Sequence, residues 1–224
     1  MIRNCFMHKT ITNLIQIKKE IQSKNLDPES KVKIIAISKT FPMKDILPLI
    51  DYGHFDFGEN KVQEALEKWT KVKSENDNIN LHMVGKLQTN KVKDAVKLFD
   101  FIHSLDSIKL AKKISEEQTK VKRDVKIFIQ INIGNEEQKN GIRIEDLSNF
   151  YKLCKYDFKL NIIGLMCLPP LNMNPAPYFE KMKQESKKLS LDYLSMGMSS
   201  DYFTALKYNA NYLRIGSKIF GQRS

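Results

Sequence analysis

Lys39 stands directly after an apolar, β-branched run, Val32–Ser38, and this run predicts a buried strand that ends at the lysine. An ammonium group at the end of an apolar strand is poorly solvated, which favours the neutral amine that a Schiff base with an aldehyde requires. Many lysines at strand ends instead extend their ammonium group to solvent. The position alone therefore leaves both interpretations of Lys39 open.

Two later segments have the composition of a phosphate site. After the seventh predicted strand, Gly197 frees the backbone, and Ser199 or Ser200 is placed to cap the next helix. After the eighth, Gly216 is followed by Ser217, again a glycine and then a hydroxyl donor. Hydroxyl groups and unpaired backbone N–H groups at helix starts bind anions. Either segment alone fits ordinary turn chemistry, but the two together favour a phosphate cradle.

Arg214 and Asn60 also lie at the ends of predicted strands. Arg214 is the only arginine between positions 144 and 222 of a chain that otherwise uses lysine, which indicates a need for the planar guanidinium. A salt bridge at the strand end is the alternative role for Arg214. Asn60 either caps the helix that follows it or faces the same end of the sheet as Lys39.

His82 and His103 are candidate acids or bases, because each lies in a short apolar run. A lone histidine in such a run is more often a packed, hydrogen-bonded structural residue. The sequence has no H-E-x-x-H motif, no Ser-His-Asp order and no close pair of carboxylates, so it indicates no metal site.

Short β-branched runs alternate with amphipathic stretches along the chain, a pattern typical of βα units and a parallel sheet. The predicted strands are Val32–Ser38, His54–Phe57, Leu81–Val84, Phe101–Ser104, Val125–Asn132, Leu160–Met166, Tyr193–Ser195 and Tyr212–Ile215. The predicted helices are Lys44–Tyr52, Lys61–Trp69, Asn90–Phe99, Ser107–Gln118, Ile144–Tyr156, Pro177–Leu189, Asp201–Tyr208 and the start of another at Ser217–Phe220. One further helix opens the chain, because Ile11, Leu14, Ile15, Ile17 and Ile21 share half of a helical wheel.

Eight such units in 224 residues predict an α/β fold, a (β/α)8 TIM-type barrel with an extra N-terminal helix. We expect residues 1–224 to form this single domain, without a C-terminal β-domain. Functional groups of such barrels lie where the carboxyl ends of the strands meet, and phosphate is often held after strands seven and eight. The competing architecture, an open doubly wound sheet, normally brings a G-x-G-x-x-G turn that this sequence lacks.

The composition, with 42% hydrophobic residues, excludes disorder and collagen-like repeats, and no apolar run approaches the ~20 residues of a membrane span. The net charge is +11, which raises nucleic acid as a partner. The lysines are spread along the chain beside acids and asparagines, so we favour a compositional bias over nucleic-acid binding. Cys5, Cys154 and Cys167 are odd in number and far apart, which fits no disulfide framework and favours the reducing cytoplasm.

The stretches that carry a family resemblance cover nearly the whole chain: Ala36–Thr40, Phe57–Glu64, His82–Lys91, Gln130–Ile133, Lys139–Gly141, Gly164–Met166, Leu194–Ser199 and Arg214–Gly221. In these the sequence resembles the YggS/PROSC family of pyridoxal phosphate homeostasis proteins, which is related to the N-terminal barrel of bacterial alanine racemase. The resemblance implies that Lys39 carries pyridoxal 5'-phosphate as an internal aldimine. It implies that Ser199 and the backbone at Gly216 and Ser217 hold the phosphate, and that Arg214 faces the pyridine nitrogen. Asn60 is implied to lie beside the cofactor.

The family is understood to bind and buffer the cofactor without clear catalytic turnover. A racemase needs a second base, a tyrosine from a C-terminal β-domain of the partner subunit, and this sequence shows no such domain. We therefore expect a cytoplasmic protein of pyridoxal phosphate homeostasis that is not an enzyme, with apoenzymes that depend on the cofactor as candidate partners. Without the second domain's dimer contacts we expect a monomer. The alternatives are a racemase-like enzyme that uses Lys39 and His82 and, from charge alone, a nucleic-acid binder.

Overall fold

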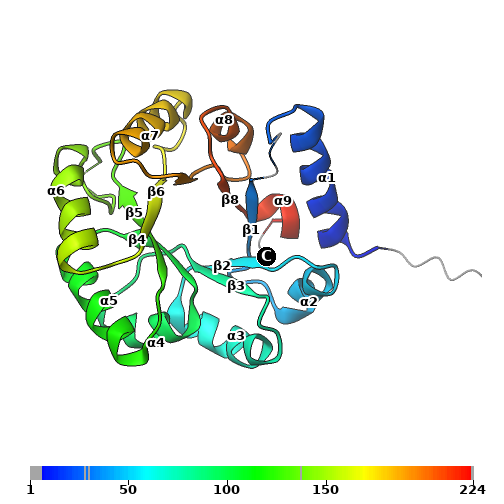
Figure 1. The fold of residues 1–224 in the computed structure, drawn as a ribbon. Coiled ribbons are helices and arrows are strands. Elements are labelled where there is room, and N and C mark those ends of the chain that lie inside the picture. The colour runs from blue at the N-terminus through cyan, green and yellow to red at the C-terminus, as the bar shows by residue number, and fades with distance from the viewer. Residues whose placement is uncertain (1–6, 28, 30, 137, 223–224) are drawn as a thin grey trace, which may run out of the picture.

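The computed structural model describes residues 7–27, 29, 31–136 and 138–222. In this part of the chain eight parallel strands pair in sequence order and close into a barrel, which Figure 1 shows with its surrounding helices. The strands are β1 (Lys33–Ile37), β2 (Asp56–Glu59), β3 (Asn80–Met83), β4 (Phe101–Leu105), β5 (Lys126–Ile131), β6 (Ile162–Cys167), β7 (Tyr193–Ser195) and β8 (Tyr212–Ile215). The (β/α)8 barrel predicted from the sequence is confirmed, and the doubly wound alternative is wrong.

Helices cover the outside of the barrel. They are α1 (Lys9–Ser23), α2 (Met43–Asp51), α3 (Val62–Glu75), α4 (Val92–Leu98), α5 (Ile108–Val121), α6 (Leu147–Lys152), α7 (Ala176–Lys188), α8 (Tyr202–Lys207) and α9 (Ser217–Phe220). The predicted helix Ile144–Tyr156 is a series of three types, since a 3₁₀ turn (η2, Ile144–Asp146) precedes α6 and a π turn (η3, Leu153–Asp157) follows it. A second 3₁₀ turn (η1, Thr89–Lys91) precedes α4. Within the described ranges, no helix has the length and apolar character to cross a membrane.

The second strand begins at Asp56, two residues later than the predicted His54–Phe57. The backbone N–H of His54 donates to the carbonyl of Leu49 at 2.9 Å, which completes the turn after α2 and keeps His54 out of the sheet. Asp56 is then the first β2 residue in register with β3, opposite Asn80.

Alternation along the strands separates two apolar clusters. Ile34 and Ala36 of β1 belong to the larger cluster, between the strands and the helices. Ile35 and Ile37 belong to a smaller cluster inside the barrel, with Phe101, Phe128, Met166 and Tyr212. Because side chains alternate between the two faces of a strand, Lys39 continues the inward-facing series of β1 beyond Ile37.

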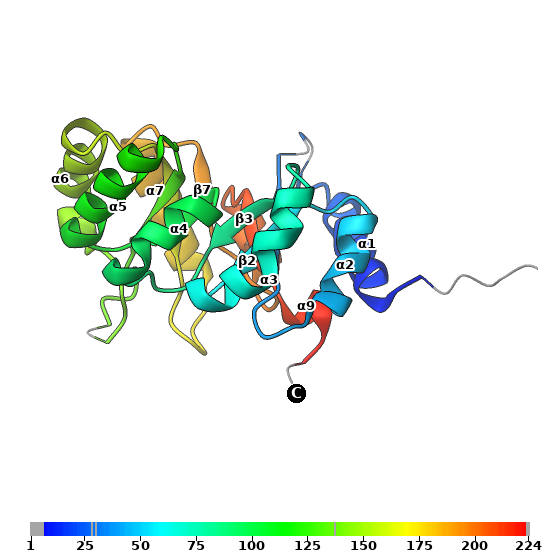
Figure 2. The same cartoon turned by 90° about the horizontal axis from the view of Figure 1, so that it is seen from below.

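The N-terminal helix α1 packs beside α2 and α9 (Figures 1 and 2). The Asn13 amide donates to the carbonyl oxygen of Ile219 in α9 at 2.9 Å. The Tyr202 hydroxyl of α8 donates to Glu20 at 2.7 Å. The extra helix α1 thus forms hydrogen bonds with both short helices that follow β7 and β8, namely α8 and α9.

Candidate functional site

A cavity of about 610 Å³ lies where the carboxyl ends of β1, β2, β7 and β8 meet. The described residues that line it are Ile37, Lys39, Asn60, Val84, Leu168, Met198, Ser199, Ser200, Arg214, Gly216, Ser217, Gly221 and Gln222. The structure therefore brings to one cavity all six residues that the family resemblance assigns to the cofactor. Their part in binding a ligand stays a prediction.

The turn that carries Lys39 is held in place by side chains of α3. Thr40 has a left-handed φ of +68°, and its backbone N–H donates to Glu64 Oε1 at 2.6 Å. The Lys68 ammonium donates to the carbonyl oxygens of Ser38, at 2.8 Å, and Phe41, at 3.3 Å. Both backbone carbonyls that flank the turn are thereby fixed to one cation.

A buried carboxylate, Glu59, completes this arrangement. Its Oε1 atom lies 2.7 Å from Lys68 Nζ and accepts hydrogen bonds from the Ser38 hydroxyl at 2.8 Å and the Trp69 indole at 3.0 Å. The Glu59 side chain has no solvent exposure. Because the surroundings have a low dielectric constant, the attraction between Glu59 and Lys68 is stronger than it would be in water. The sequence analysis gave no role to Glu59 or Lys68. The i,i+4 spacing of Glu64 and Lys68 was the available signal, and it resembled an ordinary helix-surface pair.

The opposite wall of the cavity is built from backbone turns. Gly197 has a φ of +91°, which favours glycine, and its carbonyl accepts the backbone N–H of Arg214 at 2.9 Å. The prediction that Ser199 or Ser200 caps the next helix is wrong, because α8 has Asp201 at its N-cap position. The Ser199 hydroxyl instead accepts the backbone N–H of Lys218, in the first turn of α9, at 3.3 Å. Ser199 thus ties the β7 loop to the helix that follows β8.

Arg214 is 5% exposed and forms no ion pair within the described residues. Its guanidinium donates to the Ser195 hydroxyl at 2.6 Å and to the carbonyl of Cys167 at 2.8 Å. The alternative role for Arg214, a salt bridge at the strand end, is therefore not seen in the described part of the chain. Burial lowers the pKa of the guanidinium, yet an arginine keeps its charge in proteins. The residue places a fixed positive charge at the cavity.

Asn60 lines the cavity and does not cap α3, whose N-cap position is held by Lys61. The loop after β3 approaches Asn60 closely at Gly85. A Cβ atom on Gly85 would lie 2.3 Å from the Asn60 carbonyl oxygen, so any larger residue would push the two loops apart.

Comparisons with known proteins place this chain in a family. The model of the alanine racemase N-terminal domain matches residues 13–224. The pyridoxal phosphate homeostasis protein of Pasteurella multocida is 35% identical over 224 residues, covering 94% of this chain and 96% of that one. The chain belongs to the family of pyridoxal phosphate homeostasis proteins. The resemblance seen in the sequence is confirmed.

Solved structures with a similar fold support this assignment to the family. PipY of Synechococcus elongatus, solved with PLP bound, is 30% identical with a TM-score of 0.84, covering 95% of this chain and 100% of that one. An alanine racemase of Clostridium difficile is 16% identical with a TM-score of 0.73, and the match covers 96% of this chain and 57% of the racemase chain. At this low identity the likeness concerns the barrel fold alone.

The two histidines considered as acids or bases lie inside the barrel, and neither lines the cavity. Both side chains are fully buried. His82 stacks on Phe101 and His103 on Phe128, each with ring centroids 4.3 Å apart. Burial lowers the pKa of both imidazoles, so both are neutral near pH 7. Both histidines are thus the packed, hydrogen-bonded residues that the sequence favoured, and His82 does not lie where the alternative of a base beside Lys39 needs it.

Cys154 and Cys167 are buried free thiols, and burial raises the pKa of each to about 12. Such thiols are inert at neutral pH. Cys5 lies outside the described residues.

Proposed function

We propose that this protein binds pyridoxal 5'-phosphate in the cavity at the barrel mouth, with Lys39 as the point of covalent attachment, and takes part in homeostasis of this cofactor. The observation that carries the proposal is that Lys39 from β1 and Arg214, Ser199 and Ser217 from the β7–β8 side line one cavity. A relative that is 30% identical, PipY, has been solved with PLP bound.

The donor set of the cavity fits this cofactor. Arg214 brings a positive charge, Lys39 an amine and three serines hydroxyl groups, while none of the described lining residues is a carboxylate. This balance suits an anionic phosphate ester. The apolar lining residues, which suit the faces of an aromatic ring, are Ile37, Val84, Leu168 and Met198.

The roles that we propose for the individual residues rest on their positions in the cavity and on the family resemblance. When bound, the cofactor supplies an aldehyde that condenses with an amine and a ring that withdraws electrons. Lys39 provides the amine. Ser199 and the backbone N–H groups at Gly216 and Ser217 bind the phosphate, because the first N–H groups of α9 have no partner within the helix. Arg214 would face the ring nitrogen of the bound cofactor, as the family resemblance implies, and its positive charge would disfavour protonation of that nitrogen.

We further propose that binding is not followed by turnover. Racemisation at a carbon needs a base on each face, and a single lysine serves one face. Lys39 is the one amine among the described residues of the cavity lining, and the histidines of β3 and β4 lie inside the barrel. The apoenzymes that receive the cofactor, the cytoplasmic location and the monomeric state remain predictions from the sequence.

A titration with pyridoxal phosphate tests the proposal. We expect the wild-type protein and Lys61→Ala, a control in the loop beside Asn60, to develop a saturable absorbance band at a longer wavelength than the band of the free cofactor. Lys39→Ala should lose this band and keep its fold by circular dichroism. A wild-type protein without saturable binding, or a Lys39→Ala variant that keeps the band, contradicts the proposal.

A further inference from the structure

A continuous series of hydrogen bonds crosses the barrel interior from Arg214 to Asp56. The Arg214 guanidinium lies 2.6 Å from Ser195 Oγ, and Ser195 Oγ lies 2.8 Å from His103 Nδ1. His103 Nε2 lies 3.0 Å from His82 Nδ1, and His82 Nε2 lies 3.1 Å from Asp56 Oδ1. Five residues from β8, β7, β4, β3 and β2 are thus joined by four hydrogen bonds, and we call them the interior chain.

The two ends of the interior chain fix the direction of every hydrogen bond in it. Arg214 can only donate, so the Ser195 hydroxyl accepts from it and donates its own proton to His103 Nδ1. A neutral His103 then carries its proton on Nε2 and donates to His82 Nδ1. His82 in turn carries its proton on Nε2 and donates to the Asp56 carboxylate, which only accepts. The order of donation is therefore Arg214, Ser195, His103, His82, Asp56.

The middle of the interior chain is sealed from solvent. Ser195, His103 and His82 have no exposed surface. Tyr212 covers the imidazoles from β8, with ring centroids 6.0 Å from His103 and 6.1 Å from His82. In such surroundings an unsatisfied donor or acceptor is costly, so a change of tautomer at one imidazole forces a change at the next.

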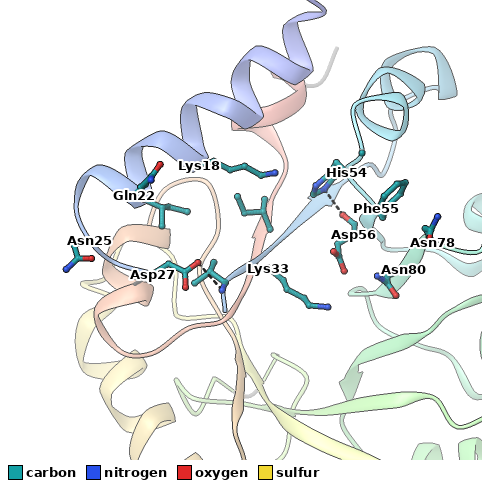
Figure 3. Close-up of a pocket in the computed structure, with 14 residues that line it drawn as sticks. Lys18, Gln22, Asn25, Asp27, Lys33, His54, Phe55, Asp56, Asn78 and Asn80 are labelled. Carbon is teal, nitrogen blue, oxygen red and sulfur yellow. Dashed lines mark hydrogen bonds between the residues drawn. The ribbon is translucent and has the colours of Figure 1, made fainter. Parts of the chain in front are cut away.

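Asp56 ends the interior chain in a second cavity, of about 850 Å³, at the amino ends of β1, β2 and β3. Figure 3 shows Asp56 in this cavity with Lys33, His54 and Asn80 around it. Its side chain is 20% exposed. The His54 ring lies 3.0 Å from the Asp56 backbone oxygen, so the Asp56 carboxylate remains the partner of His82.

We propose that Asp56 is a positioning residue for Arg214 and acts on it through His82, His103 and Ser195. This inference rests on the proposed function, in which Arg214 faces the ring nitrogen of the cofactor. By accepting the last hydrogen bond, Asp56 keeps both imidazoles in the Nε2–H form, which leaves His103 Nδ1 to accept from Ser195. Ser195 is then oriented to accept from Arg214, and the guanidinium is held in one place beside the mouth cavity.

Removal of the Asp56 charge makes the reverse order of donation accessible. The amide of an Asp56→Asn variant can donate to His82 Nε2, which moves the proton of His82 to Nδ1 and that of His103 to Nδ1 as well. The Ser195 oxygen then faces two donors, and its own proton loses its acceptor. Asp27→Asn is a matched control, because Asp27 lines the same cavity but accepts hydrogen bonds from the backbone N–H groups of Lys31 and Val32.

The first test uses the cofactor-free protein and nitrogen NMR of its histidine rings. We expect His82 and His103 to be neutral Nε2–H tautomers in the wild type and in Asp27→Asn. In Asp56→Asn a population of the Nδ1–H form should appear at His103, which does not touch position 56. A wild-type His103 with its proton on Nδ1, or a His103 signal that is the same in Asp56→Asn, overturns the proposal.

The second test measures the dissociation constant for pyridoxal phosphate. We expect Ser195→Ala to weaken binding about tenfold and Asp56→Asn about threefold, with Asp27→Asn unchanged. The absorbance band of the bound cofactor should shift in the first two variants. Equal affinity and an equal band in Asp56→Asn and Asp27→Asn overturn the proposal.

The two tests separate this inference from the proposed function and from a merely structural role. If the wild-type protein fails to bind the cofactor, the proposed function is wrong, and the NMR test still decides whether Asp56 controls the tautomer of His103. A structural role alone would lower the melting temperature of Asp56→Asn without moving the His103 tautomer or the absorbance band, and that result also overturns the proposal.

Discussion

The two walls of the mouth cavity are built by different physical means. The β1 wall, which carries Lys39, is fixed by Lys68, which forms ion pairs with the buried Glu59 and the partly exposed Glu64 and donates hydrogen bonds to two backbone carbonyls. The β7–β8 wall consists of glycine turns, serine hydroxyl groups and the start of a short helix. The contacts in the first wall therefore stabilise the fold, whereas the second wall offers hydrogen-bond donors to a ligand. Substitutions in the two walls should separate stability from affinity.

The largest effect is expected at Lys68. Lys68→Met keeps most of the side-chain volume but leaves the Glu59 carboxylate buried without its cation, so it should lower the free energy of unfolding by about 3 kcal/mol. Lys71→Met is the control on the same helix, because Lys71 forms an exposed pair with Glu75 at 3.9 Å. It should cost less than about 0.5 kcal/mol. Urea denaturation measures both, and equal losses would show that the β1 wall is not held by this ionic contact.

On the other wall, Ser199→Ala should leave urea denaturation nearly unchanged and weaken pyridoxal phosphate binding by about one to two decades, the value of a charge-assisted hydrogen bond. Pyridoxal, which lacks the phosphate, should bind the wild type far more weakly and lose little further affinity in the variant. If Ser199→Ala weakens pyridoxal as much as pyridoxal phosphate, Ser199 does not act on the phosphate.

The fold and the composition of the cavity were accessible from the sequence, whereas the contacts that hold Lys39 and Arg214 were not. Alternating apolar runs predicted each strand to within two residues. Residues at strand ends meet at the mouth in any such barrel, so Lys39, Asn60 and Arg214 could be brought together by topology alone. The two histidines were correctly favoured as packed, hydrogen-bonded residues, but their partners could not be predicted, because a strand pattern gives the face of a residue and not its contacts across the barrel. Glu59 was missed because two of its partners, Lys68 and Trp69, come from α3, and the packing of that helix against the barrel decides whether they reach it.

The smallest effect concerns turnover, because we expect no racemisation at the rate of an ordinary enzyme. Incubation of the cofactor-loaded protein with L-alanine in deuterium oxide should give at most slow loss of the α-proton and no accumulation of D-alanine. Magnetic resonance and chiral chromatography measure the two. Racemisation faster than about 1 per second, near the low end of ordinary enzymes, would contradict the proposal that binding is not followed by turnover and would indicate a racemase.

The most direct test of the account is the site of covalent attachment. The protein is loaded with pyridoxal phosphate, reduced with borohydride, digested and mapped by mass spectrometry. We predict that the added mass lies on Lys39 in the peptide that joins β1 to α2, and that Lys39→Ala carries no comparable label. Stoichiometric label on another lysine, with Lys39 unmodified, would contradict the account.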